Sequence, residues 1–352
     1  MRKHVVCCAA LAVAVLVCFG SNSFSQKAEK PEPRPEPAAE AVSLAESNNR
    51  FGLELLAECR KDDRNIVISP ASIAMCLQLL ATSADGTTED ELREMMHVEE
   101  ADLPKSNRSL LDHWKEREGV KLEVANGVWA NSRRIKPAED FSKQASENFD
   151  AEITSMDFAA ENALQVINEW ISEHTNNMIK DMLEKLLDTD PCVIANAVYF
   201  KGDWKREFDE KRTRKGTFNS PTGTRDDVWM MHSGLRSWRY LEDGKTQIVS
   251  MPYKGGEFAS MWIILPPAAE DMNEFAKRTD AATLDGWFEK ASKRLVDVTL
   301  PRFKMRSKIK LNKPLQNLGM KLAFDTRADF HKLAADDSKA FYVVEVAHEA
   351  VV

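Results

Sequence analysis

Histidine and glutamate stand side by side near the end of the chain, and together they begin a catalytic pattern. His348 and Glu349 match the first two positions of the zinc-protease motif H-E-x-x-H, but the fifth position is Val352, so the second histidine ligand is missing from the motif. The sequence also contains no G-x-S-x-G, no phosphate-binding loop and no G-x-G-x-x-G. We therefore predict that the protein is not an enzyme and uses no metal or cofactor.

Three other polar residues, together with His348, stand where the apolar pattern of the chain calls for none. Ser69 and Ser72 open an apolar helical segment, Asn196 is the centre of the apolar run CVIANAVYF, and His348 interrupts an apolar terminal segment. A buried amide or imidazole without a partner costs about 1–3 kcal/mol. We expect each of these groups to meet a partner from far along the sequence, with Asn196 and His348 as one candidate pair.

Basic residues form a second pattern. Arg302, Lys304, Arg306, Lys308 and Lys310 occupy alternate positions, and a strand would place all five on one face. We favour the interpretation in which the charged face of this strand is solvated and its opposite, apolar face is buried. The alternative is a surface for an anionic polymer or an acidic partner.

The elements that must position these residues are helices early in the chain and strands late. Ser69-Pro70 predicts a capped, buried helix that ends near Asp85-Gly86. Thr88 to Met96 is predicted as a short helix capped by Thr88 and Glu91. Helical periodicity extends over 137–149, 163–183 and two short segments after 270. Strand patterns cover 121–130, 192–200, 228–232, 247–253, 258–266 and 294–305.

Among these strands, 192–200 is predicted to be central in a sheet and buried on both faces, because its apolar run is unbroken apart from Asn196. Helices that precede strands, without regular alternation, indicate an α+β fold and not a doubly wound α/β fold.

The N-terminus has the composition of a targeting segment. Arg2 and Lys3 precede an apolar run, and Ser23 and Ser25 provide small residues before a cleavage point, so residues 1–25 are predicted to be a signal peptide. The alternative is a lipoprotein modified at Cys18, but Val17 is not the small residue expected directly before such a cysteine. Residues 26–46 are rich in Pro and Glu and are predicted to be an extended linker, which leaves residues 47–352 as the folded domain.

Composition limits the classes of partner. The chain has 352 residues, a net charge of -8 and an apolar fraction of 43%. The negative charge argues against a nucleic-acid binder, and no segment after the signal peptide is long and apolar enough for a membrane span. We expect a secreted protein, extracellular or, in a bacterium, periplasmic. Three cysteines follow the cleavage point, so no disulfide scaffold is expected.

Several motifs, in one order, resemble the serpin family of serine protease inhibitors. The resemblance extends from about Asn48 to Val352, and the segments that carry it are NIVISPASIAMCLQLLATSADGTTEDEL (65–92), VANGVWA, IANAVYFKGDWKREFD (194–209), VWMMH, SMPYKGGEFASMWIILP, VTLPRFKM, LGMKLAF, ADF and VAHEAVV. It implies a serpin-like α+β fold in which helices pack around a large mixed β-sheet with smaller sheets.

The resemblance also assigns roles to the polar residues. Ser69, Ser72, Asn196 and His348 match the family's "shutter", a hydrogen-bonded group beneath the two strands that part when a new strand enters the large sheet. Trp204 matches the "breach" tryptophan, where insertion starts. For the four polar residues, the alternative is a static polar network that only fixes the strand register. For Trp204, the alternative is ordinary core packing.

The function implied is suicide-substrate trapping. A serine or cysteine endopeptidase attacks an exposed bait loop, and the cleaved loop then enters the large sheet as a strand. In this family the segment matching VAHEAVV continues into that loop, so we expect the reactive bond and the closing strands to be absent from this chain. A truncated, non-inhibitory serpin-like protein with a binding or vestigial role is the alternative. A hydrolase or metalloenzyme is a third reading that no motif favours.

Overall fold

The computed structural model describes residues 3–6, 37–60, 65–114, 120–220, 223–254, 259–268, 270–335 and 342–352. Most of the predicted signal peptide, including Ser23 and Ser25, lies outside the described residues. Of its residues, Lys3–Val6 form strand β1, which pairs in parallel with strand β9 (Ser292–Pro301). Cleavage after residue 25 would remove β1.

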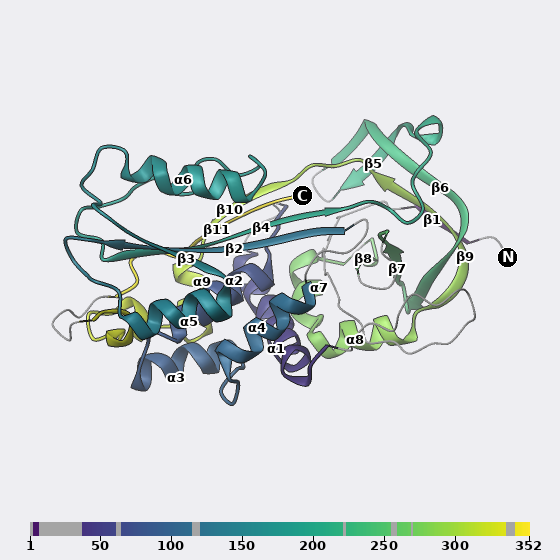
Figure 1. Ribbon diagram of the computed structural model, residues 1–352. Coiled ribbons are helices and arrows are strands. Elements are labelled where there is room, and N and C mark those ends of the chain that lie inside the picture. The colour runs from purple at the N-terminus through teal and green to yellow at the C-terminus, as the bar shows by residue number, and fades with distance from the viewer. Residues whose placement is uncertain are drawn as a thin grey trace, which may run out of the picture.

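Helices and strands follow one another along the chain in the order shown in Figure 1. The α-helices are α1 Ala39–Cys59, α2 Pro70–Ala81, α3 Gly86–Met95, α4 Leu103–Trp114, α5 Glu139–Phe149, α6 Ala163–His174, α7 Met272–Arg278, α8 Ala281–Lys290 and α9 Asn312–Leu318. The other strands are β2 Val120–Asn131, β3 Ala151–Met156, β4 Cys192–Gly202, β5 Arg214–Ser220, β6 Gly223–Asp243, β7 Thr246–Pro252, β8 Ser260–Leu265, β10 Arg306–Lys310 and β11 Ala347–Val351.

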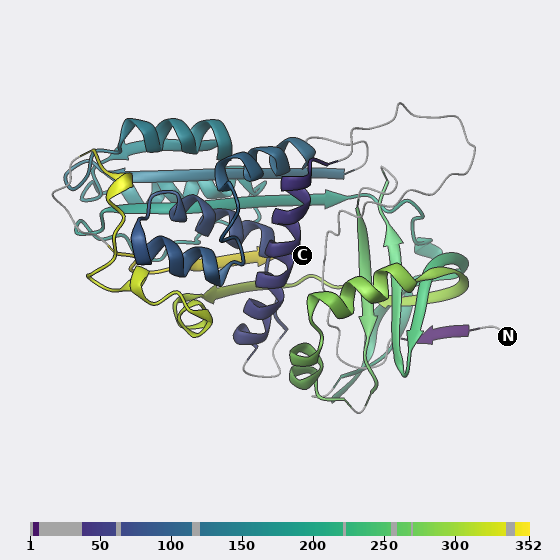
Figure 2. The ribbon, with the colours of Figure 1, turned by 90° about the horizontal axis from the view of Figure 1, so that it is seen from below.

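One layer of the molecule consists of two groups of strands. The first group has the order β3-β2-β4, and the second is the antiparallel pair β10-β11. Both groups lie between α6 on one side and α2 and α5 on the other (Figure 1), and the view from below places β11 on the side of β4 (Figure 2). No pairing joins β4 to β11 in the described part of the chain.

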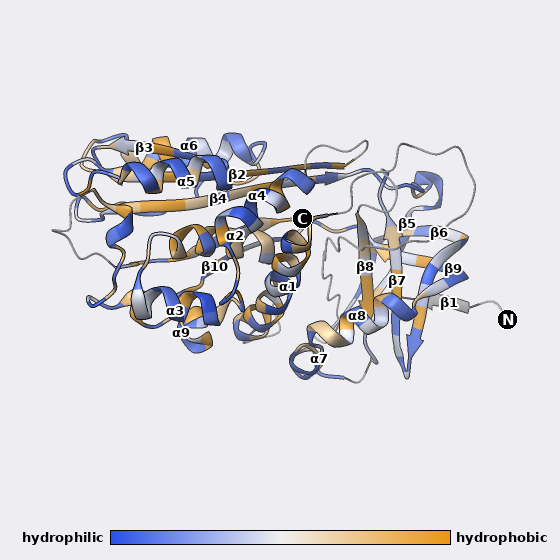
Figure 3. Ribbon diagram, turned by 60° about the horizontal axis from the view of Figure 1, so that its bottom comes forward, coloured by the Kyte–Doolittle hydropathy of each residue, from blue (hydrophilic) through white to orange (hydrophobic). Residues whose placement is uncertain are grey.

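A second sheet occupies the other end of the molecule. Its order is β1-β9-β6-β7-β8, with β5 paired to β6, and α7 and α8 pack beside it (Figure 2). Apolar colour covers much of β4, α2, β7 and β8 in Figure 3. Burying these surfaces supplies most of the stabilisation of such a fold, at roughly 25 cal/mol per Å² of apolar area.

Helix α2 begins where the sequence predicts, and it is the most buried helix around the layer. Ser69 is its N-cap, with the Ser69 side chain accepting a hydrogen bond from the Ser72 N–H at 3.4 Å, and Pro70 is its first residue. Pro at this position has no N–H to leave unpaired. Met75, Leu79 and Ala81 are fully buried, so α2 positions its polar first turn as part of the core.

Several predicted element boundaries differ from those in the structure, and helix α2, for example, ends at Ala81 and not near Asp85-Gly86. Helix α1 begins at Ala39, so the predicted linker 26–46 ends earlier than expected. Helix α3 begins at Gly86 with Asp85 as N-cap, not at Thr88. Glu91, the expected capping partner, instead accepts hydrogen bonds from the Lys321 and Leu322 N–H groups at 2.8 and 2.6 Å. A long-range contact has replaced the local one.

The helix predicted over 163–183 is also too long, since α6 ends at His174. The Thr175 hydroxyl donates to Ile171 O at 2.8 Å and accepts from the Ile179 N–H at 3.2 Å. Asn176 and Asn177 then take positive φ values of 50° and 58°, which reverses the chain. Asn tolerates this left-handed conformation better than most residues.

Strand β4 is not the central strand that its apolar sequence predicts. It lies at the edge of the β3-β2-β4 group, and its one partner among the described strands is β2. The basic stripe is likewise only partly a strand. Arg306, Lys308 and Lys310 lie on β10, whereas Arg302 and Lys304 lie in the connection before it. Among the described helices, none combines the length and the apolar character that a membrane crossing needs.

Candidate functional site

The segment from Val67 to Ser72, which leads into the first turn of α2, contacts both groups of strands in the layer. The Val67 N–H donates to the Ser307 hydroxyl of β10 at 2.9 Å, and the Ser69 N–H donates to Nε2 of His348 on β11 at 3.0 Å. The Ser72 hydroxyl donates to Oδ1 of Asn196 on β4. One short segment therefore connects strands that do not pair with each other.

The four predicted residues meet through α2 and not through a direct Asn196–His348 contact. Asn196 is 9% exposed and His348 is 5% exposed, so both are buried as expected. Their partners, Ser72 and Ser69, are three residues apart on one helix turn. The expectation of long-range partners is met, but the candidate pair Asn196–His348 is replaced by two separate contacts with α2.

A fifth residue, Asn126, completes this polar group and was not singled out from the sequence. Asn126 lies directly opposite Asn196 in the β2–β4 register, and Nδ2 of Asn196 donates to its Oδ1 at 2.8 Å. Nδ2 of Asn126 donates to Phe149 O at 2.6 Å. The signal was present: Asn126 interrupts the alternating segment 121–130 in the way that Asn196 interrupts its own strand.

His348 is held in its neutral form. Because a backbone N–H can only donate, Nε2 of His348 must accept from Ser69, which places the ring proton on Nδ1. Burial lowers the pKa of His348 to about 4, since the interior disfavours the charged imidazolium. Protonation at Nε2 would also remove the hydrogen bond from Ser69.

A large cavity extends from α1 and the second sheet to the boundary between β4 and β11. Its whole volume is about 1350 Å³, and the part of its lining at this boundary includes Asn196 and Val198 of β4 and the β11 residues from His348 to Val351. The edge of β4 away from β2 and the edge of β11 away from β10 carry no pairing in the described residues. We call the part of the cavity between these two edges the slot. It is bounded by backbone groups that an added strand could pair.

Each of the three basic residues of β10 is paired with a nearby carboxylate. Arg306 pairs with Glu349, Nζ of Lys308 lies 2.7 Å from Oε1 of Glu184, and Nζ of Lys310 lies 2.8 Å from Oε2 of Glu345. This arrangement agrees with a solvated face. It gives no support to an anionic-polymer site on β10.

Trp204, the predicted breach residue, lies just beyond β4 against the end of β7. Its ring stacks on Tyr253 with centroids 4.6 Å apart and an interplanar angle of 14°, and Phe208 packs edge-on at 6.3 Å. Burial raises the pKa of Tyr253 to about 12. Gly202 allows this packing, because a Cβ at that position would lie 2.6 Å from Cδ1 of Tyr253.

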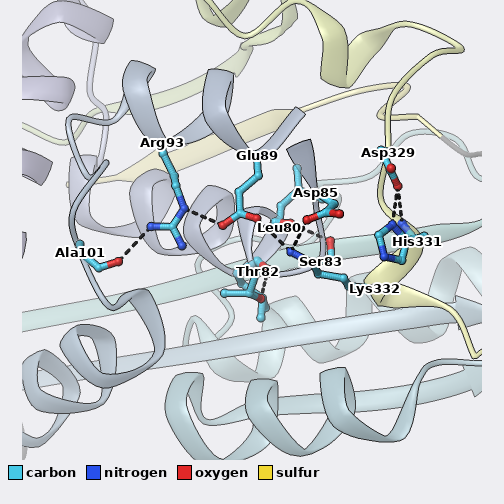
Figure 4. Close-up of polar contacts among 11 residues, drawn as sticks. Leu80, Thr82, Ser83, Asp85, Glu89, Arg93, Ala101, Asp329, His331 and Lys332 are labelled. Atoms are coloured by element: carbon cyan, nitrogen blue, oxygen red, sulfur yellow. Dashed lines mark hydrogen bonds and ion pairs between the residues drawn. The ribbon is translucent and has the colours of Figure 1, made fainter. Parts of the chain in front are cut away.

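A cluster of charged side chains joins α3 to the segment before β11 (Figure 4). Donor atoms of Asp85, Asp329 and His331 lie within 4.8 Å of one another, as in a metal site. However, Nζ of Lys332 lies 2.9 Å from Oδ1 of Asp85 and 3.0 Å from Oε2 of Glu89, so a cation is already in place. The Lys332 ammonium lowers the pKa of Asp85, and the hydrogen bond from His331 lowers that of Asp329. We interpret the cluster as a group of ion pairs that connects the two segments.

The three cysteines of the described residues are free thiols. Sγ of Cys76 lies 3.8 Å from Ile194 O at the α2–β4 interface. Burial raises the pKa of both Cys76 and Cys192 to about 12, so neither thiol is a ready nucleophile or metal ligand.

Comparison with known proteins identifies the architecture. The family model described as "Serpin (serine protease inhibitor)" matches residues 46–352. Among curated proteins, Iripin-2 of Ixodes ricinus is 30% identical over 328 residues, which cover 90% of this chain and 81% of that protein. Neuroserpin of Gallus gallus is 29% identical, with coverage of 82% of this chain and 73% of that protein.

Solved structures give the same result. Reaction-loop-cleaved lamprey angiotensinogen superposes with a TM-score of 0.81 at 25% identity, over 89% of this chain and 94% of that one. The thermophilic serpin Tengpin matches in its latent state, with a TM-score of 0.82 at 27% identity over 91% of this chain and 86% of that one. The family is described as one of serine protease inhibitors and not of catalytic enzymes. The chain belongs to the serpin family.

Proposed function

We propose that the protein is a secreted inhibitor of serine or cysteine endopeptidases, which traps its target when a cleaved bait segment enters the slot between β4 and β11. The observation that carries this proposal is the slot itself. Among the residues that the structure describes, β4 and β11 each have one unpaired edge, both edges line one cavity, and helices lie on either side of the layer (Figure 1). An inserted strand would pair with both edges at once.

The trapping chemistry belongs to the protease. Its serine or cysteine attacks the scissile carbonyl of the bait, an acyl-enzyme forms, and the new amino terminus leaves. Insertion of the segment that remains attached to the inhibitor then pulls the acylated protease along the layer before water can hydrolyse the ester or thioester. The inhibitor supplies a substrate and a conformational change but no catalytic group.

The polar group under the slot fits a gating role. Ser69 and Ser72 contact opposite sides of the slot through His348 and Asn196, so strand entry must pass directly above these hydrogen bonds. In the proposal these four residues act as the shutter, and Trp204 at the end of β4 acts as the breach. A polar network with more than one satisfied arrangement can hold two strands together or let them part.

Covalent complex formation tests the proposal. The protein expressed from its complete gene would be incubated with a chymotrypsin-like, a trypsin-like and a papain-like protease. An SDS-resistant complex is expected with at least one of them. A second arm adds an unstructured peptide of Thr and Ala to the 352-residue chain, and a rise in Tm is expected if the slot takes a strand. No complex with any protease would contradict the inhibitory function.

A non-inhibitory role is the second candidate, and one observation favours it. In the described part of the chain, the two strands that an inhibitor must separate on insertion are already unpaired. A slot that stays open stores less free energy for trapping, and it belongs to a larger cavity with room for a ligand. Peptide binding without any covalent complex would support this second role.

A further inference from the structure

Glu349 is a buried carboxylate with one oxygen unused. Its side chain is 0% exposed, Oε1 accepts from Nε of Arg306, and Oε2 has no hydrogen-bond partner within the part of the chain that the structure describes. A buried acceptor of this kind without a donor is costly, because folding removes it from water and returns no hydrogen bond. The position therefore calls for a donor.

The nearest strand neighbour on β10 does not provide one. Lys308 lies directly opposite Glu349 in the β10–β11 register. Its Nζ instead donates to Glu184 Oε1 at 2.7 Å and to Asp181 O at 3.0 Å, both in the segment that follows α6.

The strand on the other side of the slot does not provide a donor either. Side chains alternate along a strand, and Asn196 and His348 both point towards α2, so their neighbours point the opposite way, towards α6. On this face β4 presents Ala195 and Ala197, whose side chains have no polar atom. Within the described residues, β4 therefore offers no side-chain donor to Glu349, whereas an element inside the slot would lie on that side.

The surroundings define the chemistry of the missing donor. Arg306 already offsets the charge of Glu349, so a second cation would bring an uncompensated charge into a buried site. Ile171, Ile179 and Met182 line the cavity on the α6 side, so the surroundings there are largely apolar apart from Thr175. Side chains opposite one another on neighbouring strands have Cβ atoms roughly 4.5–5.5 Å apart, within reach of a short donor. A small neutral hydroxyl fits these conditions.

We infer that Glu349 selects the segment that enters the slot, by accepting a hydrogen bond from a serine or threonine on its α6-facing side. This inference rests on the proposed function, because it requires a strand in the slot. It gives the slot a chemical preference at one position, whereas backbone pairing alone accepts any extended segment. An acidic residue at that position is excluded by repulsion from the buried carboxylate.

Two labelled peptides test the inference on the 352-residue chain. One contains six Thr-Ala repeats and the other six Val-Ala repeats, a length that suits the 11 residues of β4, and both end in the same Gly-Lys-Lys tail for solubility. Val has the shape of Thr without the hydroxyl. Fluorescence anisotropy is expected to show at least about tenfold tighter binding of the Thr peptide to the wild type, since hydrogen bonds to charged acceptors are among the stronger ones.

Substitutions locate the preference. Glu349→Met should reduce the preference for Thr to within about twofold, and Glu349→Gln should retain most of it because the amide can still pair with a hydroxyl. Glu345→Gln is the matched control, since it removes an exposed carboxylate of the same segment that pairs with Lys310, and it should leave the preference unchanged. If Glu349→Met does not fold, infrared difference spectra of the ¹³C-Glu-labelled wild type replace it, with a carboxylate shift expected for the Thr peptide only.

The possible failures are distinct. Binding of neither peptide would contradict strand insertion itself, and this inference with it. Equal binding of both peptides to the wild type would leave insertion intact and overturn the role of Glu349. A preference for Thr that persists in Glu349→Met, or no carboxylate shift in the labelled protein, would also overturn it, because the hydroxyls would then be recognised elsewhere.

Discussion

The Ser69 N–H donates to Nε2 of His348 across 279 positions of sequence, at 3.0 Å. This contact ties the start of α2 to β11, and it exists only while the imidazole is neutral. The stability of the fold should therefore depend on the protonation state of one buried side chain.

The first prediction concerns pH. The pKa of His348 is about 4 in the fold against an ordinary value of 6.5, so the unfolded state binds the proton more tightly. The resulting stabilisation is fully present above pH 6.5 and is lost as the pH falls towards 4, with a total on the order of 3 kcal/mol. Urea unfolding between pH 7 and pH 4 should show this loss in the wild type. The His348→Gln variant should lack this acid-induced loss of stability. The His331→Gln variant, which changes an exposed histidine, should retain it. Parallel curves for all three proteins would contradict the assignment.

The second prediction concerns Asn126 and Asn196. Removal of either amide leaves the other with a buried unpaired group, so Asn126→Ala and Asn196→Ala should each lower the free energy of unfolding by about 1–3 kcal/mol. The double variant should cost less than the sum, because both partners of the 2.8 Å hydrogen bond are then gone. Asn162→Ala, at an exposed position without a capping hydrogen bond, is the control and should have little effect. Strict additivity would show that the two amides do not interact.

Local signals predicted some of this site, and long-range pairing decided the rest. Ser69 and Pro70 predict the start of α2, because helix capping depends on residues that are adjacent in the sequence. The run CVIANAVYF announces a strand, but its place at an edge beside the slot depends on β11, which lies about 150 residues further along the chain. Nothing in the sequence around Glu349 indicates a buried carboxylate with one unpaired oxygen. Its unpaired oxygen becomes visible only when the contacts of Arg306 and Lys308 are known.

The third prediction concerns the sequon Asn107-Arg108-Ser109. Asn107 is fully buried in α4, where its Nδ2 donates to Gln78 Oε1 at 3.0 Å and to Leu103 O at 2.9 Å. Gln78 in turn donates to Asn48 Oδ1 at 2.7 Å. A glycan cannot be accommodated there, so mass spectrometry of folded protein secreted from eukaryotic cells should find Asn107 unmodified. Folded molecules with a glycan at Asn107 would show that α4 is placed differently.

The fourth prediction concerns Gly202 and the aromatic packing at the end of β4. A Cβ at Gly202 would press against the Tyr253 ring, which cannot easily move because it stacks on Trp204. Gly202→Ala should therefore lower the free energy of unfolding by about 1–3 kcal/mol. Tyr253→Leu has its own cost, but in that background the added penalty of Gly202→Ala should shrink, which a double-mutant cycle measures.

Gly286 provides the matched control for this substitution. It lies within α8, and a Cβ there would have no atom within 4 Å. Gly286→Ala should raise the free energy of unfolding by about 0.4–1 kcal/mol, because alanine restricts the unfolded chain and favours the helix. The same chemical change should thus have opposite signs at the two positions. Equal effects at Gly202 and Gly286 would mean that the Tyr253 ring is free to move, and that Trp204 does not hold it against the end of β4.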